Sequence, residues 1–372
     1  MNTQNARLAS YFGRLLAALL LLTCAACGGE SNLASAPTRA HAPVVPLTRT
    51  WQMGFAFTPP RPTTTAVIQG IDRWSTRAEL AAIHQELPWR DLLGGMSPDA
   101  ILDRDMVQLI NYMRGKGLKI FFMADITDGL SRAEEAPQLR ALGRSIMEPD
   151  VQAVYRSYVL AAARKLNPDF IGLAAETNLI RAAASPAVYA AVVRAANDAA
   201  ADLRAAGNSA TLLVSVQVET GWGVLGGNSP YSGIERDFTD FPFAQMLGLS
   251  SYPYLGYAQP EDIPANYYTR LLNGRTIPVM VVEGGWTSAS VANVRSSEAL
   301  QARYVARHDA LLRSVNARGL IQLLFSDVDM TSLPQPVPVN LPLFVKIGLT
   351  DADLNAKPVL AEWDAMFAKR LQ

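Results

Sequence analysis

The chain has 372 residues, with 33 basic and 33 acidic side chains and an apolar fraction of 49%. A balanced charge without charged runs offers no field that would attract nucleic acid, and the apolar fraction is too high for a disordered chain. The length fits one (β/α)8 barrel with a leader segment.

The leader is predicted from the first residues. Arg7 and Arg14 precede an apolar stretch over residues 15–26, which is too short to span a bilayer and is typical of a secretory signal. The stretch ends in Cys24-Ala-Ala-Cys27, which resembles a bacterial lipobox with Cys24 where Leu is usual. The resemblance implies cleavage before Cys27 and a lipid on that residue. The alternative is a plain signal peptide with an incidental cysteine.

Three segments follow from this interpretation. Residues 1–26 are a lipoprotein signal peptide, residues 27–48 are a flexible tether rich in Ala, Pro and Ser, and residues 49–372 are the barrel domain. Both cysteines lie in or beside the leader, so no internal disulfide is predicted. We expect an exported protein that is anchored to the bacterial cell envelope and contacts the membrane through its N-terminal lipid.

From Trp51 onward, short apolar runs alternate with amphipathic helical patterns, which is typical of βαβ units. The runs predicted as strands cover residues 51–57, 80–87, 118–124, 170–175, 211–218, 246–251, 277–282 and 320–325. The clearest helices cover residues 99–114, 149–165, 186–206 and 297–318. The strands are almost continuously apolar, as expected when both faces are covered. The pattern predicts an α/β fold with a single (β/α)8 TIM barrel, and the lack of a Gly-rich loop after the first strand argues against nucleotide binding.

Two glutamates, Glu176 and Glu283, end apolar strand-like runs. An ionisable group at the end of a buried strand is costly unless it is paired, hydrogen-bonded or used. Two carboxyl groups at one barrel mouth fit glycoside hydrolysis, in which one protonates the leaving oxygen and the other attacks the anomeric carbon or activates water. Both are therefore predicted to be catalytic. The alternative is a pair of structural acids bound to loop arginines such as Arg90 or Arg181.

Further polar and aromatic residues follow or end the predicted strands, where the loops of a barrel build its site, and His84 lies inside the second predicted strand. Flat aromatic rings offer faces on which sugar rings can rest. The candidate substrate-binding residues are His84, Trp89, Asp125, Asn178, Glu219, Trp222, Tyr252, Tyr254, Trp286 and Asp327. For some of them a structural role stays open, as a core histidine (His84), a loop cap (Glu219) or a supporting hydrogen-bond partner (Asp125 and Asp327). His308 is expected at the surface. No ligand-spaced histidine cluster is present, so neither a metal nor another cofactor is predicted.

Three segments resemble the endo-β-1,4-galactanases, glycoside hydrolase family 53. Their "IGLSYYP" strand is similar to Leu247-Gly-Leu-Ser-Ser-Tyr-Pro-Tyr254, and their "ETGW" strand to Val279-Met-Val-Val-Glu-Gly-Gly-Trp286. Their "GNEIN" strand is matched in part by Gly172-Leu-Ala-Ala-Glu-Thr-Asn178. The resemblance implies a retaining β-glycosidase with Glu176 as acid/base and Glu283 as nucleophile. The family's Asn that binds the substrate 2-hydroxyl is replaced by Ala175, while Asn178 aligns with its second Asn.

The expected function is thus a retaining β-glycosidase that acts on an oligo- or polysaccharide. Two other interpretations remain. Asp125, Glu176 and Glu219 mimic the carboxylate triad that holds Mg²⁺ in enolase-type barrels, which would make the protein a different class of enzyme. Ala175 motivates the second, a lipid-anchored glycan-binding protein that keeps the cleft without turnover.

Overall fold

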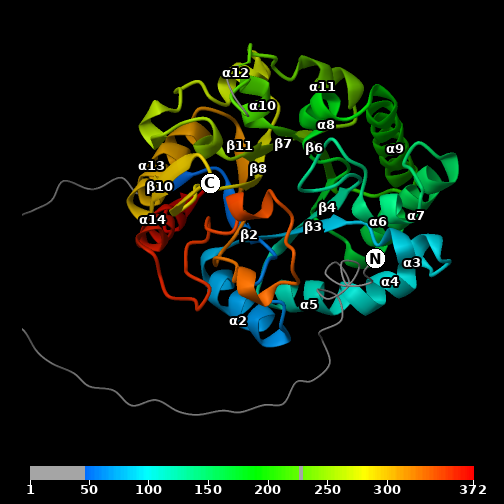
Figure 1. Cartoon of the computed structure of the whole chain (residues 1–372), viewed down its shortest axis with the longest axis horizontal. Helices are drawn as coiled ribbons and strands as arrows, with labels where there is room; N and C mark the ends of the chain where they lie inside the picture. Colours follow the sequence, from blue (N-terminus) through cyan, green and yellow to red (C-terminus); the bar gives the residue numbers. More distant parts are fainter. Residues whose placement is uncertain (1–46, 226–228) are drawn as a thin grey trace, which may run out of the picture.

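Eight parallel strands form a closed barrel in the computed structural model, which describes residues 47–225 and 229–372 (Figure 1). The barrel strands are β2 (Gln52–Ala56), β3 (Leu80–Glu86), β4 (Lys119–Asp125), β5 (Phe170–Gly172), β6 (Thr211–Gln217), β7 (Met246–Ser251), β8 (Val279–Gly284) and β11 (Ala317–Gln322). Each strand pairs with the next along the chain, and β11 closes the ring on β2. The predicted (β/α)8 barrel is confirmed. The predicted signal peptide, most of the tether and Cys27 lie outside the described residues.

Helices surround the barrel (Figure 1). They are α2 (Thr64–Trp74), α3 (Trp89–Leu93), α4 (Pro98–Asp105), α5 (Val107–Gly115), α6 (Pro137–Ala141), α7 (Pro149–Leu166), α8 (Thr177–Ala183), α9 (Pro186–Ala205), α10 (Val218–Trp222), α11 (Glu235–Asp240), α12 (Thr269–Leu272), α13 (Glu298–Arg313) and α14 (Pro358–Phe367). In the part of the chain that the structure describes, none of them is long and apolar enough to cross a membrane.

Short elements complete the chain. They are the strands β1 (Thr48–Arg49), β9 (Ala289–Val291), β10 (Val294–Ser297) and β12 (Arg370–Leu371), and the 3₁₀ turns η1 (Ser75–Arg77), η2 (Pro253–Leu255), η3 (Pro260–Asp262), η4 (Met330–Ser332) and η5 (Leu341–Leu343). β1 and β12 pair in parallel, so the first and last described segments meet. The buried guanidinium of Arg49 strengthens this junction, because it donates to Lys369 O and Phe367 O, each at 3.2 Å.

The apolar core has two parts because each barrel strand is covered on both faces. A small cluster fills the barrel interior and includes Leu80, Phe121, Met123, Leu213 and Met280. A larger cluster lies between the barrel and the helices and contains the alanine-rich face of α9. This packing explains why the predicted strands read as continuous apolar runs.

Several predicted boundaries were wrong. The strand predicted over residues 170–175 ends at Gly172. The helix predicted over 99–114 is two helices that meet at Met106. The helix predicted over 297–318 ends at Arg313, and the eighth strand begins at Ala317. His308 was expected at the surface but is buried.

Burial of His308 follows from the inward-facing side of α13. Its Nε2 lies 3.1 Å from the Tyr268 hydroxyl, and its ring packs against Tyr304 at a centroid distance of 5.0 Å. Burial also lowers the pKa of His308 to about 3, so the imidazole is neutral. The amphipathic pattern of the helix alone did not show which face this residue occupies.

Candidate active site

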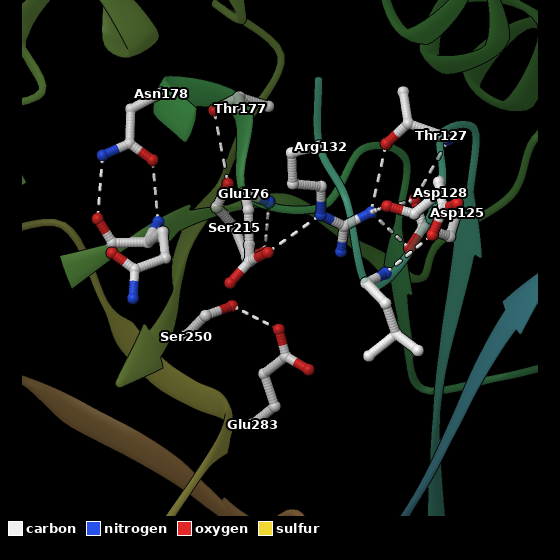
Figure 2. Close-up of polar contacts among 12 residues, drawn as sticks. Asp125, Thr127, Asp128, Arg132, Glu176, Thr177, Asn178, Ser215, Ser250 and Glu283 are labelled. Atoms are coloured by element: carbon white, nitrogen blue, oxygen red, sulfur yellow. Dashed lines mark hydrogen bonds and ion pairs between the residues drawn. The ribbon is translucent and has the colours of Figure 1, made fainter. Parts of the chain in front are cut away.

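Glu176 and Glu283 lie at the same mouth of the barrel, although 107 positions separate them in the sequence. Glu176 follows β5 and caps the start of α8, while Glu283 lies near the carboxyl end of β8. Figure 2 shows their carboxyl groups pointing toward one another across the opening. Each residue is only 8% exposed. The structure therefore brings the two predicted catalytic groups together in a nearly dry site.

The backbone of Glu176 adopts a left-handed conformation, with φ of 52°. This region is unfavourable for a residue with a side chain and persists where the surroundings over-determine it, often at functional sites. Here the Glu176 N–H donates to Ser215 Oγ at 2.9 Å, and the neighbouring Thr177 hydroxyl bonds to Asp237 Oδ1 at 2.7 Å. These contacts fix the direction in which the Glu176 side chain leaves the barrel.

Arg132, in the loop between β4 and α6, is the residue that the sequence analysis missed. Its side chain donates from Nε to Glu176 Oε2 at 2.8 Å and from Nη1 to both carboxylate oxygens of Asp125, at 2.8 and 2.7 Å (Figure 2). Arg132 is 4% exposed. Glu176 is thus paired with a loop arginine, as the structural alternative expected, although with neither Arg90 nor Arg181. No periodicity or motif distinguishes Arg132 from the other loop arginines.

Burial and neighbouring charges shift the pKa values of Glu176 and Asp125 in opposite directions. Burial raises the pKa of Glu176 to about 7, although the charge of Arg132 opposes this and that of Glu283 adds to it. Burial alone would also raise the pKa of Asp125, but the adjacent Arg132 and His84 lower it to about 2. Near neutral pH, Glu176 can therefore exchange a proton while Asp125 stays ionised.

Glu283 has its own set of contacts. The Ser250 hydroxyl donates to Glu283 Oε1 at 2.6 Å (Figure 2), and His84 Nδ1 lies 3.7 Å from Glu283 Oε2. The other nitrogen of that ring, Nε2, lies 2.7 Å from Asp125 Oδ2. A chain of polar contacts therefore runs from Arg132 through Asp125 and His84 to Glu283. This chain of contacts orients Glu283, which the Tyr252 hydroxyl also contacts.

Two glycines explain the sequence that follows Glu283. A Cβ on Gly284 would lie 2.4 Å from Ser251 O. Gly285 has φ of 144°, which side chains rarely adopt, and a Cβ there would lie 2.6 Å from Gln322 Nε2. The Glu-Gly-Gly sequence lets β8 approach its neighbours closely at the point where Glu283 enters the site.

Tyr252 also belongs to the site. It follows β7 and is buried, and its ring packs against Phe344 at a centroid distance of 4.9 Å. Burial and the charges of Glu283 and Glu176 raise the pKa of Tyr252 well above its ordinary value. Its hydroxyl is therefore neutral and can donate a hydrogen bond beside the two glutamates.

Two other candidates have contacts that already occupy their polar atoms. The amide of Asn178 donates to Gln217 O at 2.8 Å and accepts from Gln217 N at 2.7 Å (Figure 2), so both of its ends bind backbone. Glu219 is completely buried and accepts from Tyr252 N at 3.0 Å and the Tyr267 hydroxyl at 2.7 Å. Both residues support the loops around the site from within the protein.

The remaining candidates pack or pair within the protein. Trp89 is buried, and Trp286 is buried between Tyr254 and Tyr304, at centroid distances of 6.1 and 5.4 Å. Tyr254 is also buried and donates its hydroxyl to Leu343 O at 2.9 Å. These rings therefore offer little free surface to a sugar.

Trp222 and Asp327 are held in a similar way. The Trp222 ring stacks on Tyr267 at a centroid distance of 5.3 Å and lies under the Arg270 guanidinium at 4.7 Å. Asp327 is buried and forms a 2.5 Å ion pair with Lys357. The structure thus gathers only His84, Asp125 and Tyr252, of the predicted binding residues, directly around the two glutamates.

A segment after β11 crosses the mouth of the barrel; we call residues 338–345, which include η5, the strap. Asn340 Nδ2 donates to Leu130 O at 2.8 Å in the loop after β4. The strap also accepts the Tyr254 hydroxyl at Leu343 O and packs Phe344 on Tyr252, both of which follow β7. The strap therefore joins two nearly opposite sides of the barrel above the site.

The protein matches no family model and no curated protein by sequence. Solved structures share its fold. The exo-β-1,4-mannosidase Op5Man5 from Opitutaceae bacterium strain TAV5 superposes with a TM-score of 0.65 at 15% identity, over 86% of this chain and 59% of that one. The chain thus spans less than two thirds of the mannosidase. A GH5_18 protein from Streptomyces cattleya, solved with GlcNAc, gives a TM-score of 0.63 at 18% identity, over 86% and 80% of the two chains.

A third structure, the apo form of a β-glucosidase named 1317, gives a TM-score of 0.56 at 14% identity, over 83% of this chain and 88% of that one. The structural neighbours are glycoside hydrolases. At these identities the likeness establishes the barrel fold, and the chemistry of this chain rests on its own residues.

Proposed function

We propose that this protein is a retaining β-glycosidase that acts on an oligo- or polysaccharide, with Glu176 as acid/base and Glu283 as nucleophile. The observation that carries the proposal is the pair of carboxyl groups that face each other in one nearly dry opening (Figure 2). One of them has a pKa of about 7, raised by burial, and the other is oriented by Ser250 and His84. Two carboxyl groups held in different environments are what this reaction requires.

In the first step, Glu283 Oε2 attacks the anomeric carbon, because Oε1 already accepts from Ser250. The bond between that carbon and the glycosidic oxygen breaks, and its electron pair goes to the oxygen, which takes the proton of Glu176. In the second step, the Glu176 carboxylate removes a proton from water. The water oxygen then attacks the anomeric carbon and displaces Glu283, which restores both side chains.

Arg132 has two roles in this proposal. Its charge stabilises the Glu176 carboxylate that forms when the proton leaves, since the Nε–Oε2 contact is already in place at 2.8 Å. Its Nη2 group makes no hydrogen bond to the described residues, because the contacts of this side chain come from Nε and Nη1. It is a free donor for a sugar hydroxyl, at a site where Ala175 cannot supply the amide found in the galactanases.

The finer assignments are also proposals. The motif resemblance supports a galactanase-like substrate, whereas the solved neighbours include an exo-β-1,4-mannosidase and a β-glucosidase. Galactanases, this mannosidase and this glucosidase all act on β-linked neutral sugars, so we propose that substrate class. The leader sequence supports export and anchoring to the cell envelope through a lipid on Cys27.

The test is hydrolysis of β-1,4-linked galactan, mannan and glucan oligosaccharides by the full chain. Glu283→Gln and Glu176→Gln are expected to abolish release of reducing ends, whereas Glu261→Gln, a matched change at an exposed residue on the surface, leaves it unchanged. A 2-deoxy-2-fluoro glycoside with a good leaving group is expected to add its sugar mass to the peptide that contains Glu283. Labelling of another residue would contradict the assignment.

The alternatives predict different results. A glycan-binding protein would bind these oligosaccharides without releasing reducing ends; the presence of Ala175 favours this second candidate. An enolase-type enzyme would lose activity in EDTA. Its proposed metal ligands are otherwise engaged, because Asp125 binds Arg132 and Glu219 binds Tyr252 and Tyr267. Within the described residues, no cluster of three or more His, Cys, Asp or Glu side chains could hold a metal ion.

A further inference from the structure

We propose that the strap closes one side of the site, so that the enzyme removes sugars from the non-reducing end of a chain and does not cut within it. This inference rests on the proposed glycosidase function and adds the mode of attack. An enzyme that cuts within a polysaccharide needs a groove that is open on both sides of its carboxyl pair. The strap and the packed aromatic rings together leave no groove that is open on both sides.

The strap is tied on three sides. Asn340 bonds to Leu130 in the loop after β4, at 2.8 Å. Leu343 O accepts the hydroxyl of Tyr254, which follows β7, at 2.9 Å. Just past the strap, Lys346 O accepts the N–H of Ser288, which follows β8, at 2.9 Å. Because β4 and β7 are three strands apart in a ring of eight, the segment between these ties spans the mouth.

These ties lie next to the reacting groups. Leu130 is two positions from Arg132, which binds Glu176. Phe344 packs on Tyr252, whose raised pKa reflects burial and the nearby charges of Glu283 and Glu176. The strap therefore lies beside groups that contact the two glutamates.

The closed side is the side of the sugar that is attacked. The strap follows β11, the neighbour of β8, which carries Glu283, and two of its three ties lie on that half, at Tyr254 and Ser288. The third tie, at Leu130, is the one that reaches the half in which Glu176 follows β5. The leaving oxygen must contact Glu176, so the departing part of the substrate lies toward that other half. A sugar held under the strap consequently has little room for a further unit beyond it.

The aromatic residues support the same conclusion. A long polysaccharide groove uses rings that are open to solvent on one face. Trp89, Trp286 and Tyr254 are instead buried, and Trp222 is stacked on Tyr267. None of these four predicted sugar-binding rings therefore has a free face, because Trp222 also lies under the Arg270 guanidinium.

The first measurement follows product lengths. Galacto-, manno- and cello-hexaose, each β-1,4-linked and fluorescently labelled at the reducing end, are incubated with the full chain. The inference expects the labelled pentaose as the first product, followed by shorter labelled products one sugar at a time. Labelled di- or triose as the first product, which reports cleavage inside the chain, would overturn it.

The second measurement does not depend on turnover. The Glu176→Gln variant is titrated with each hexaose and with the same hexaose capped by a 4,6-O-benzylidene group at its non-reducing end. The cap is expected to weaken binding at least about tenfold, as a clash in a filled site does. Equal binding of capped and uncapped ligands would overturn the inference. If the variant bound only uncapped ligands and the wild type hydrolysed none of them, the site would be closed at one end but the glycosidase function would be wrong.

Variants of the strap sharpen the result. Asn340→Ala removes the tie to Leu130 and is expected to reduce the effect of the cap. Gln335→Ala is the matched control, because its side chain bonds only to Met330 O and Leu333 O within the same loop, and it should leave the effect unchanged. If the oligosaccharides neither bind nor react, both the inference and the proposed function are wrong.

Discussion

Arg132 donates from Nε to Glu176 Oε2 at 2.8 Å, in an ion pair that is almost completely shielded from water. A buried guanidinium lowers the pKa of an adjacent carboxyl group, but here burial of Glu176 outweighs that charge and raises its pKa to about 7. The ion pair therefore tunes Glu176 without locking it in one protonation state. A group with such a pKa suits proton transfer near neutral pH.

The first prediction concerns pH. Glu176 must carry a proton to act as the acid, and that proton is lost as the pH rises through about 7. We expect kcat/KM to fall above that pH. In Arg132→Gln, the charge that lowers the pKa of Glu176 is gone, so the decline should move to higher pH. Initial rates between pH 5 and 10 measure both curves.

The control for this prediction is Arg140→Gln, a matched change on the same side of the barrel at an exposed arginine that pairs with Asp128. It should leave the pH of the decline unchanged. If the decline in Arg132→Gln stayed at the wild-type pH, or moved to lower pH, another group would control it.

The second prediction concerns the nucleophile. Ser250→Ala removes the 2.6 Å hydrogen bond to Glu283 Oε1. Hydrogen bonds to charged groups contribute about 1.5–3 kcal/mol, so we expect kcat to fall by roughly 10- to 100-fold. Steady-state kinetics should show this loss with a melting temperature close to that of the wild type.

The neighbouring Ser251 provides the control. Its hydroxyl accepts from Tyr268 and has no contact with Glu283. Ser251→Ala should lower the melting temperature and leave kcat almost unchanged. A similar loss of kcat in both variants would show that general disturbance of β7, and not the bond to Glu283, reduces the rate.

The barrel and the two glutamates were predictable because both follow from local patterns. Apolar runs of strand length recur with helical segments between them, and Glu176 and Glu283 each end such a run. Parallel strands then necessarily bring their carboxyl ends to one mouth. The strained backbone at Glu176 was not predictable, since it depends on contacts with β6.

Arg132 and the fate of the aromatic residues could not be predicted for a related reason. Arg132 lies in a loop without periodicity, and its partners Asp125 and Glu176 become neighbours only when the barrel closes. Trp89 and Trp286 follow strands as sugar-binding rings often do, but whether a ring faces solvent or core depends on tertiary packing. The sequence does not encode that choice locally.

The third prediction uses buried Glu219. Burial raises its pKa to about 7, although it accepts hydrogen bonds from Gln217, Tyr252 and Tyr267. In the unfolded chain it ionises near pH 4.3, so between these values the unfolded state holds fewer protons and the free energy of unfolding falls as the pH rises. The total effect is about 4 kcal/mol. In Glu219→Gln, denaturation between pH 4.5 and 8 should show a flatter dependence than in the wild type.

The matched control is Glu235→Gln at an exposed residue that pairs with Arg275. It should keep the wild-type pH dependence between pH 4.5 and 8. A Glu219→Gln variant whose stability fell with pH as steeply as that of the wild type would show that Glu219 is ionised in the folded protein.

The fourth prediction compares two lysines that pair with the same carboxylate. Lys357 is buried, with Nζ 2.5 Å from Asp327 Oδ1 and 2.9 Å from Ser288 Oγ, whereas Lys346 is 48% exposed and 3.4 Å from Asp327 Oδ2. Lys357→Met leaves a buried charge without its main partner and should cost about 3–5 kcal/mol in the free energy of unfolding. Lys346→Met should cost less than about 1 kcal/mol. Urea denaturation measures both.

The pair itself contributes less than that loss. Burial raises the pKa of Asp327 and lowers that of Lys357, so both shifts favour the neutral forms in spite of the short contact. Desolvation therefore consumes most of the attraction between the two charges. The double variant Asp327→Asn with Lys357→Met should recover most of the stability lost in Lys357→Met alone. A double variant less stable than Lys357→Met alone would contradict this expectation, because removing the unpaired carboxylate would then have brought no gain in stability.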